Sequence, residues 1–183
     1  MLKLNSDGLT DVGLVRKKNE DSILILDDQL SYVVADGMGG VSGGEIASQK
    51  VVQCINDQVG CLNASVSLTD KMLSIHQAVV EANQWILGWS EKNEVQGAGT
   101  TLVLLALSEE YPWAVNILHA GDSRAYRYRG GQLQQITADH SIEQAVGDNS
   151  GQPLPSQFKG LITNAVGLKK SLALELTHAE QRA

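Results

Sequence analysis

The residues in this sequence best suited to chemistry stand at the end of a short apolar run. Residues 33–35 are apolar, and Asp36 and Gly37 follow them directly, ahead of Met38-Gly39-Gly40. A carboxylate followed by glycines leaves room for a small charged ligand against the main chain. The Asp36 carboxylate and the Gly37 carbonyl are hard oxygen donors of the kind that Mg²⁺ and Mn²⁺ prefer. We therefore predict that Asp36 holds a divalent metal ion.

Two further acids are expected to come close to Asp36. The apolar stretches 22–26 and 31–35 are predicted to be strands, joined by a polar turn at 27–29. If they pair as a hairpin, Glu20 and Asp21 at the start of the first strand lie opposite Asp36 at the end of the second. The continuous apolar character of both stretches also predicts burial on both faces, as in a sheet covered by a second sheet.

Acids gathered in this way suggest hydrolysis of a phosphate ester. Carboxylates at a sheet edge could hold two Mg²⁺ or Mn²⁺ ions, which would activate a shared water for in-line attack on phosphorus. Such a site needs a cation for the substrate phosphate. Arg16 lies shortly before the acids, and its guanidinium group suits bidentate phosphate contact. The alternatives are an ordinary turn acid at Asp36 and a surface charge at Arg16.

The rest of the chain predicts elements that bring more polar residues to one rim. Helical periodicity covers about 42–59 and 70–89, and strands are predicted at 100–107, 113–120, 123–129 and 132–137. Asp122 precedes the last hairpin, and Asp139 and His140 follow it, so the three should meet at one end. An ordinary turn at Asp122 and a structural role for His140 remain alternatives. The pattern indicates an α+β domain with antiparallel sheets and helices outside.

Composition narrows the classes of partner. The chain has 183 residues, 43% of them hydrophobic, which suits one domain with a substantial core. A formal charge of −7 argues against nucleic acid or an anionic membrane as the main partner. No apolar stretch approaches the roughly 20 residues of a membrane span, and the N-terminus has no signal-peptide core. We expect a cytoplasmic protein in which Cys54 and Cys61 are reduced thiols.

Several motifs, in order along nearly the whole chain, resemble the metal-dependent protein phosphatases (the PPM or type 2C family), specifically the short bacterial kind. The resemblance implies a single phosphatase domain over residues 1–183, built as a four-layer antiparallel β-sandwich flanked by helices. The matching segments are Gly13 through Arg16 with Asn19-Glu20-Asp21, Ala35-Asp36-Gly37-Met38-Gly39-Gly40, Gly43-Gly44-Glu45-Ile46-Ala47-Ser48, Gly99-Thr100-Thr101, His119-Ala120-Gly121-Asp122-Ser123-Arg124, Thr137-Ala138-Asp139-His140-Ser141 and Thr163-Asn164-Ala165-Val166-Gly167.

The same resemblance implies a role for each residue of the predicted site. Asp36 should bridge two metal ions, and the Gly37 carbonyl should bind one of them. Asp21 and Glu20 should act through metal-bound water, while Arg16 should hold the phosphate of phosphoserine or phosphothreonine. These roles imply a protein serine/threonine phosphatase that reverses kinase signalling.

The resemblance also extends to the second half of the chain. Asp122 is implied to help bind a third, more weakly held metal ion. Residues 148–160 correspond to a variable flap thought to bias substrate choice. The implied partners are phosphorylated proteins, with a cognate serine/threonine kinase and its substrates among them.

The family pattern continues beyond the point that this sequence reaches. It goes on with a strand ending in Ser-Asp-Gly, then a helix, then a strand opened by Asp-Asn, and the two acids complete the coordination of one metal ion. The sequence reaches Ala183 about where the first of those strands would start. We therefore expect a fold without its C-terminal strands and helix. The alternative to an active phosphatase is a catalytically weak or inactive module that binds phosphoproteins.

Overall fold

The computed structural model describes residues 4–39, 43–63, 65–111, 113–146 and 155–180. Its strands are β1 (Asp21–Leu26), β2 (Ser31–Met38), β3 (Gly99–Thr100), β4 (Leu102–Leu107), β5 (Ala114–Ala120), β6 (Tyr126–Arg129), β7 (Gln132–Gln135) and β8 (Glu175–Glu180). Its α-helices are α1 (Gly43–Val59), α2 (Leu68–Lys92) and α3 (Ile142–Val146). A short 3₁₀ helix covers Ser156–Phe158.

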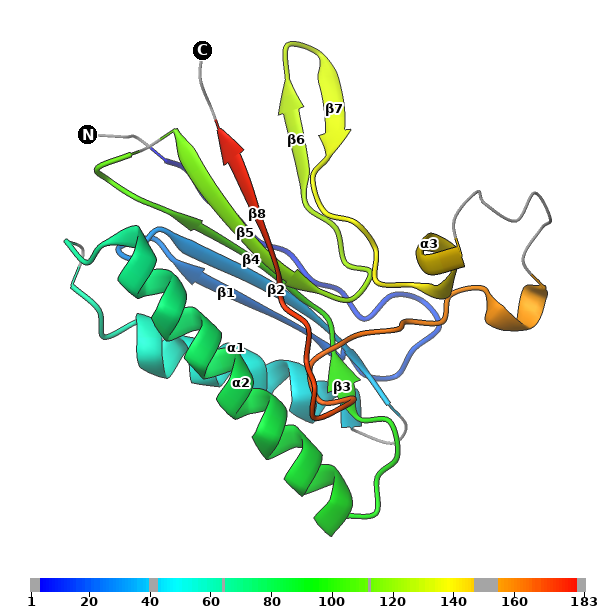
Figure 1. Ribbon diagram of the computed structural model, residues 1–183. Coiled ribbons are helices and arrows are strands. Elements are labelled where there is room, and N and C mark those ends of the chain that lie inside the picture. Colours follow the sequence, from blue (N-terminus) through cyan, green and yellow to red (C-terminus); the bar gives the residue numbers. More distant parts are fainter. Residues whose placement is uncertain (1–3, 40–42, 64, 112, 147–154, 181–183) are drawn as a thin grey trace.

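One antiparallel sheet forms the centre of the molecule. Its order is β1-β2-β4-β5-β8, and β3 pairs with the end of β2. Helices α1 and α2 cover one face of this sheet, while β6 and β7 form a separate hairpin (Figure 1). The predicted α+β class with antiparallel pairing is confirmed. Among the described residues, the second sheet of the expected sandwich consists of the β6–β7 hairpin.

The first predicted hairpin is present with the expected register. Strands β1 and β2 pair from Leu26–Ser31 at the turn to Asp21–Asp36 at the far end. The two predicted helices are also present, and Ser67 caps α2 by accepting a 3.1 Å hydrogen bond from the Asp70 amide. Residue 42, where the first helix was predicted to begin, lies outside the described residues.

The main hydrophobic core lies between the sheet and the two long helices. Each helix turns one apolar stripe toward the sheet, because its buried residues recur every three or four positions. Members of this core include Val51 and Ile55 of α1, Ile75, Val79 and Ile86 of α2, and Val33, Leu102, Leu104 and Leu118 of the sheet. The core fixes the sheet against the helices and so determines where the strand ends lie.

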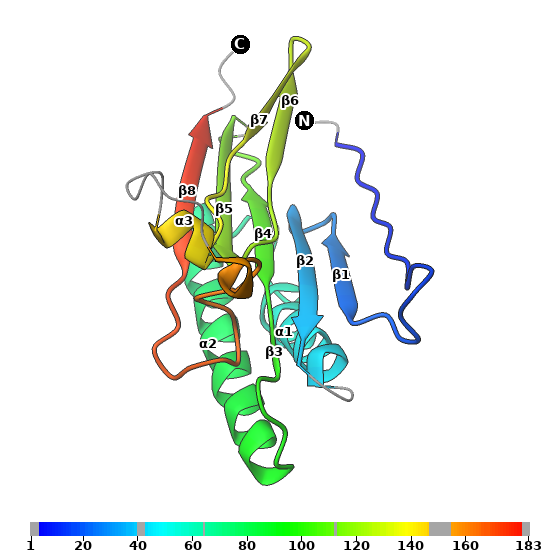
Figure 2. The same cartoon turned by 90° about the vertical axis from the view of Figure 1, so that its right-hand side faces the viewer.

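The opposite face of the sheet is incompletely covered, so the prediction that β1 and β2 are buried on both faces is wrong for the described part of the chain. Val34 is 47% exposed and Ile25 is 39% exposed. Successive strand residues alternate between faces, and only one of these faces meets the long helices. The N-terminal segment runs along β1 (Figure 2). Ala125 and Ile136 contact an apolar cluster on β4 and β5.

Other differences from the predicted elements are local. The predicted strand at 100–107 is divided at Thr101 into β3 and β4, and β8 was not predicted. Within the predicted flap, residues 148–154 lie outside the described residues. Cys54 and Cys61 are free thiols, as expected. None of the described helices combines the length and apolar character that a bilayer crossing requires.

Candidate functional site

The predicted site begins with two carboxylates on neighbouring strands. Asp21 and Asp36 are direct partners in the antiparallel register of β1 and β2. Asp36 is exposed when the whole residue is considered. Its carboxyl group has nevertheless lost part of its hydration, and this loss and the negative charge of Asp21 together raise its pKa to about 6. Arg16 opposes this shift and Asp122 adds to it. These four of the five predicted side chains therefore share one electrostatic environment.

The backbone around Gly37 is packed too closely for a side chain. The Gly37 amide donates a 3.1 Å hydrogen bond to the Glu20 carbonyl. A Cβ atom added at Gly37 would overlap the carbonyl oxygen of Gly44 at the start of α1. Ser48, also on α1, donates a 2.6 Å hydrogen bond to the same Glu20 carbonyl. Helix α1 therefore fixes Glu20 and Gly37 beside Asp36.

Thr101 joins Asp36 to the loop that carries Asp122. Its hydroxyl accepts a 3.0 Å hydrogen bond from the Asp36 amide and lies 2.6 Å from the Ser123 hydroxyl. Its own amide donates to the Asp36 carbonyl at 2.9 Å. At 1% exposure, Thr101 is a buried bridge between these two segments. The sequence analysis names Thr101 only within the matching segment Gly99-Thr100-Thr101, and its residue type does not indicate this bridge.

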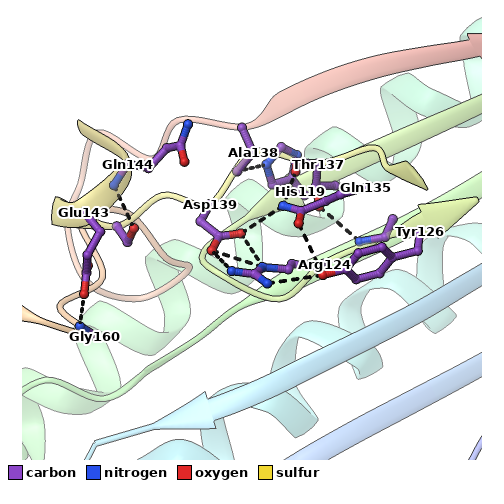
Figure 3. A network of polar contacts seen from close by, with 12 residues as sticks. His119, Arg124, Tyr126, Gln135, Thr137, Ala138, Asp139, Glu143, Gln144 and Gly160 are labelled. Atoms are coloured by element: carbon purple, nitrogen blue, oxygen red, sulfur yellow. Dashed lines mark hydrogen bonds and ion pairs between the residues drawn. The ribbon is translucent and has the colours of Figure 1, made fainter. Parts of the chain in front are cut away.

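A second segment holds the Asp122 loop from the other side. Arg124 makes a bidentate ion pair with Asp139, at 2.8 Å and 2.6 Å (Figure 3). The Thr137 hydroxyl accepts a 3.0 Å hydrogen bond from the Ala125 amide. The His140 amide also donates a 2.9 Å hydrogen bond to the carbonyl of Gly121, which precedes Asp122. The predicted meeting of the Asp122 segment with Asp139 and His140 at one end of the hairpin is therefore confirmed. The hydrogen bonds from Arg124 also hold the pKa of the Asp139 carboxyl below its usual value.

Arg16 lies in an exposed turn before β1. The same segment is attached to the site by Thr10, whose hydroxyl donates to Asp21 at 3.2 Å and accepts from Asn19 at 2.7 Å. The Asn19 side chain in turn accepts from the Asp21 amide at 3.0 Å. These contacts orient Asp21, while Arg16 is exposed and its positive charge acts on Asp36.

The oxygen-rich group fits hard divalent cations. The Asp36 carboxylate lies beside the negative charge of Asp21, which contributes to its raised pKa, and a Mg²⁺ or Mn²⁺ ion would supply the missing positive charge. Asp36, Asp21 and the Gly37 carbonyl could hold such ions, with Glu20 and Asp122 at the edge of the group.

The most compact set of ligand-type side chains lies elsewhere. Within the described residues, one group of three such side chains has ligand atoms within 4.8 Å of one another: His119, His140 and Glu175. The sequence does not predict this set, because Glu175 belongs to the unpredicted strand β8. The cross-strand pairing of His119 with Glu175 brings them together.

Comparisons with known proteins agree on one family. A family model described as Protein phosphatase 2C matches residues 16–147. The serine/threonine phosphatase stp of Listeria monocytogenes is 32% identical over 143 residues, which are 76% of this chain and 56% of that protein. This chain therefore spans little more than half the length of that relative.

Solved structures show the same likeness in three dimensions. PppA, a regulatory component of T6SS in Pseudomonas aeruginosa, has a TM-score of 0.80 and 34% identity, covering 93% of this chain and 69% of that one. The catalytic domain of the phosphatase PstP was solved in complex with two manganese ions. It has a TM-score of 0.74 and 32% identity, covering 93% of this chain and 70% of that one. The family model alone spans more than half of the sequence, and the chain therefore belongs to the protein phosphatase 2C family.

Proposed function

We propose that this chain is a metal-dependent protein phosphatase that hydrolyses phosphoserine and phosphothreonine and reverses kinase signalling. The observation that carries the proposal is the direct cross-strand pairing of Asp21 with Asp36, next to the closely packed backbone of Gly37. Membership of the family and the manganese complex of PstP support it.

Each predicted site residue has a role in this proposal. Asp36 and the Gly37 carbonyl would hold two Mg²⁺ or Mn²⁺ ions directly, and Asp21 and Glu20 would contact them through water. When bound, the two ions supply Lewis-acid activation of the attacking water and neutralise charge on the phosphate. The protein's own contribution is geometric, because β1, β2 and α1 fix the oxygen donors before any substrate arrives.

Arg16 would hold the substrate phosphate. Arg16 is exposed, and its positive charge acts on the Asp36 carboxylate, which supports a position near the acids. A guanidinium fork can donate two parallel hydrogen bonds to phosphate oxygens, which orients the phosphorus atom as well as binding it. Asp122 would help hold a third, weaker metal ion at the rim.

The wider assignments are part of the same proposal. We infer that residues 1–183 act as one phosphatase domain in the cytoplasm, with residues 148–160 as a flap that biases substrate choice. Its partners would be phosphorylated proteins, including a cognate serine/threonine kinase and that kinase's substrates.

The test is hydrolysis by the 183-residue chain itself. We expect turnover of p-nitrophenyl phosphate and of a phosphothreonine peptide that requires Mn²⁺ or Mg²⁺ and falls to background in Asp36→Asn. Asp57→Asn, a matched change on the exposed side of α1, should keep full activity. Absence of metal-dependent turnover in the wild-type chain, or equal activity in Asp36→Asn, would contradict the proposal. Phosphopeptide binding through Arg16 without turnover would instead indicate a non-enzymatic binding module.

A further inference from the structure

The turn that carries Asp122 is held at its first residue by a single histidine. Gly121 has a φ of +107°, and a Cβ atom added there would lie 2.7 Å from a methyl carbon of Thr101. Its carbonyl accepts a 2.9 Å hydrogen bond from the His140 amide. Its amide donates a 3.1 Å hydrogen bond to Nδ1 of the His140 ring. Both backbone groups of Gly121 are therefore bound by His140.

The surroundings of His140 fix which ring nitrogen carries the proton. The Asn164 side-chain amide also donates to Nδ1, at 2.9 Å. Asn164 cannot turn its amide around without losing Ala173, whose carbonyl and amide bind the two ends of that group at 2.7 Å and 3.3 Å. Because Nδ1 faces two fixed donors, it must hold the lone pair, and Nε2 must carry the proton.

Glu175 receives that proton's hydrogen bond. Its carboxylate lies 3.2 Å from Nε2 of His140. The pairing of β5 with β8 places Glu175 opposite His119, whose ring stacks on His140 with 4.7 Å between ring centroids. His119 is fully buried and donates a 2.8 Å hydrogen bond from Nε2 to the Ala138 carbonyl. The His140 ring is thus restrained on its face and at both nitrogens.

The same hydrogen bonds argue against a metal ion between His119, His140 and Glu175. A metal ion on Nε2 of His140 would need a lone pair there, while Nδ1 already uses its own to accept two hydrogen bonds. The ring would then have to lose its remaining proton, the one on Nε2, and become an imidazolate anion. Nδ1 of His119, which has no hydrogen-bond partner, is then the one free ring nitrogen of this group.

We propose that His140 is a positioning residue of the phosphatase site: kept in its Nε2-protonated form by Glu175, it fixes the Gly121 backbone and so directs Asp122 toward Asp36. The proposal deepens the proposed function and rests on it. Asp139 binds the same loop through its ion pair with Arg124. The adjacent residues Asp139 and His140 therefore hold the turn on both sides of Asp122, at Arg124 and at Gly121.

The first test uses the metal-free protein and does not depend on activity. In His140→Leu, which removes the acceptor, we expect exchange of the Gly121 amide proton to accelerate at least about tenfold. In His140→Asn, whose side-chain oxygen can take the place of Nδ1, exchange should stay within about threefold of the wild-type rate. Nitrogen NMR of the wild-type chain should show Nε2 of His140 protonated and Nδ1 unprotonated. Unchanged Gly121 exchange in His140→Leu, or the opposite ring form, would overturn the proposal.

The second test measures the Mn²⁺ concentration that gives half-maximal hydrolysis. Loss of a residue that orients a metal ligand without binding the metal typically costs about 10- to 100-fold in metal affinity or activity. His140→Leu should therefore raise this Mn²⁺ concentration by about that factor. His76→Asn, a matched change at an exposed position of α2, should leave it unchanged. If His140 acts through Asp122, the double variant with Asp122→Ala should match Asp122→Ala alone. The proposal would be overturned if the effects of His140→Leu and Asp122→Ala on the half-maximal Mn²⁺ concentration were fully additive in the double variant.

The outcomes separate the two proposals. A wild-type chain without Mn²⁺-dependent hydrolysis contradicts the proposed function, while the exchange and NMR measurements still decide the placement of Gly121. Loss of the His140 Nε2 proton on addition of Mn²⁺ or Zn²⁺ would show a metal site at the histidines, and the positioning role would then be wrong.

Discussion

Asp36 lies directly opposite Asp21, as the last pair of the β1–β2 register. This pairing places two carboxylates side by side at a strand end where the neighbouring backbone leaves no room for a side chain at Gly37. Loss of hydration raises the pKa of Asp36, and repulsion from the negative charge of Asp21 adds to that shift. The arrangement costs stability in the absence of a cation, which is common at sites built for binding.

The first prediction concerns the stability of the metal-free protein. The pKa of Asp36 is about 6 in the folded chain, above its ordinary value of 3.8. The folded state therefore binds this proton more tightly than the unfolded state, and the stabilising effect, complete below about pH 4, is lost as the pH rises through 6. Asp36→Asn should raise the free energy of unfolding at pH 7.5 by up to about 1 kcal/mol, since solvent screens an exposed group.

Urea unfolding with a metal chelator present measures this effect. The difference between Asp36→Asn and wild type should disappear near pH 4, and Asp57→Asn should show no comparable gain. A metal-free Asp36→Asn protein that is less stable than wild type at pH 7.5 would contradict the predicted repulsion.

The second prediction concerns the close approach at Gly37. Gly37→Ala should lower the free energy of unfolding by about 1–3 kcal/mol, because the added methyl group meets the backbone of Gly44. Gly88→Ala is the matched control, since it lies in α2 with no atom within 4 Å of the added group. That change should raise stability by up to about 1 kcal/mol, as expected for alanine in a helix. Thermal unfolding of both variants tests the pair, and equal effects would contradict the packing argument.

The third prediction concerns the Thr101 bridge. Thr101→Val keeps the shape of the side chain but leaves the Asp36 amide without its side-chain acceptor, at a cost of about 1–3 kcal/mol. Thr101→Ser keeps the hydroxyl and should recover most of the loss. Chemical denaturation gives the stability difference. The bridge would be shown to be unimportant if the valine variant were as stable as the serine variant.

How much of this arrangement the sequence could predict depends on distance along the chain. The β1–β2 pairing was predictable because two apolar stretches are separated by a short polar turn, which fixes the register. The long helices were predictable from their apolar periodicity. The meeting of Asp122 with Asp139 followed from a Gly130-Gly131 turn for the same reason.

Contacts between distant segments were not predictable in this way. Strand β8 reads Glu-Leu-Thr-His-Ala-Glu, whose polar residues give a weak strand signal, and its pairing with β5 joins segments about 60 residues apart. The contact of Glu175 with His140 depends on that pairing. The Thr101 bridge depends on the division between β3 and β4, which no local residue preference indicates. The exposed face of β2 differs from expectation because apolar character alone does not say what covers a strand.

The fourth prediction concerns phosphate binding. Arg16→Ala should lower kcat/KM for a phosphothreonine peptide about 10- to 100-fold, the equivalent of losing charge-assisted hydrogen bonds worth about 1.5–3 kcal/mol. Arg16→Lys should recover part of this loss, since it keeps the charge but not the fork. Lys17→Ala, in the same exposed turn, is the control and should change kcat/KM for the phosphothreonine peptide little. Steady-state kinetics at saturating Mn²⁺ measures it, and an unchanged kcat/KM in Arg16→Ala would contradict phosphate binding by this residue.

Direct binding of Mn²⁺ tests the central claim, that the Asp21–Asp36 pair captures divalent cations. The measurement is electron paramagnetic resonance of free Mn²⁺ during titration with the 183-residue chain at pH 7.5, repeated with Asp36→Asn and Asp57→Asn. We predict that the wild-type chain and Asp57→Asn remove the free Mn²⁺ signal equally, and that Asp36→Asn does not. A wild-type chain that leaves the signal unchanged, or an Asp36→Asn variant that binds as well as wild type, would contradict the account.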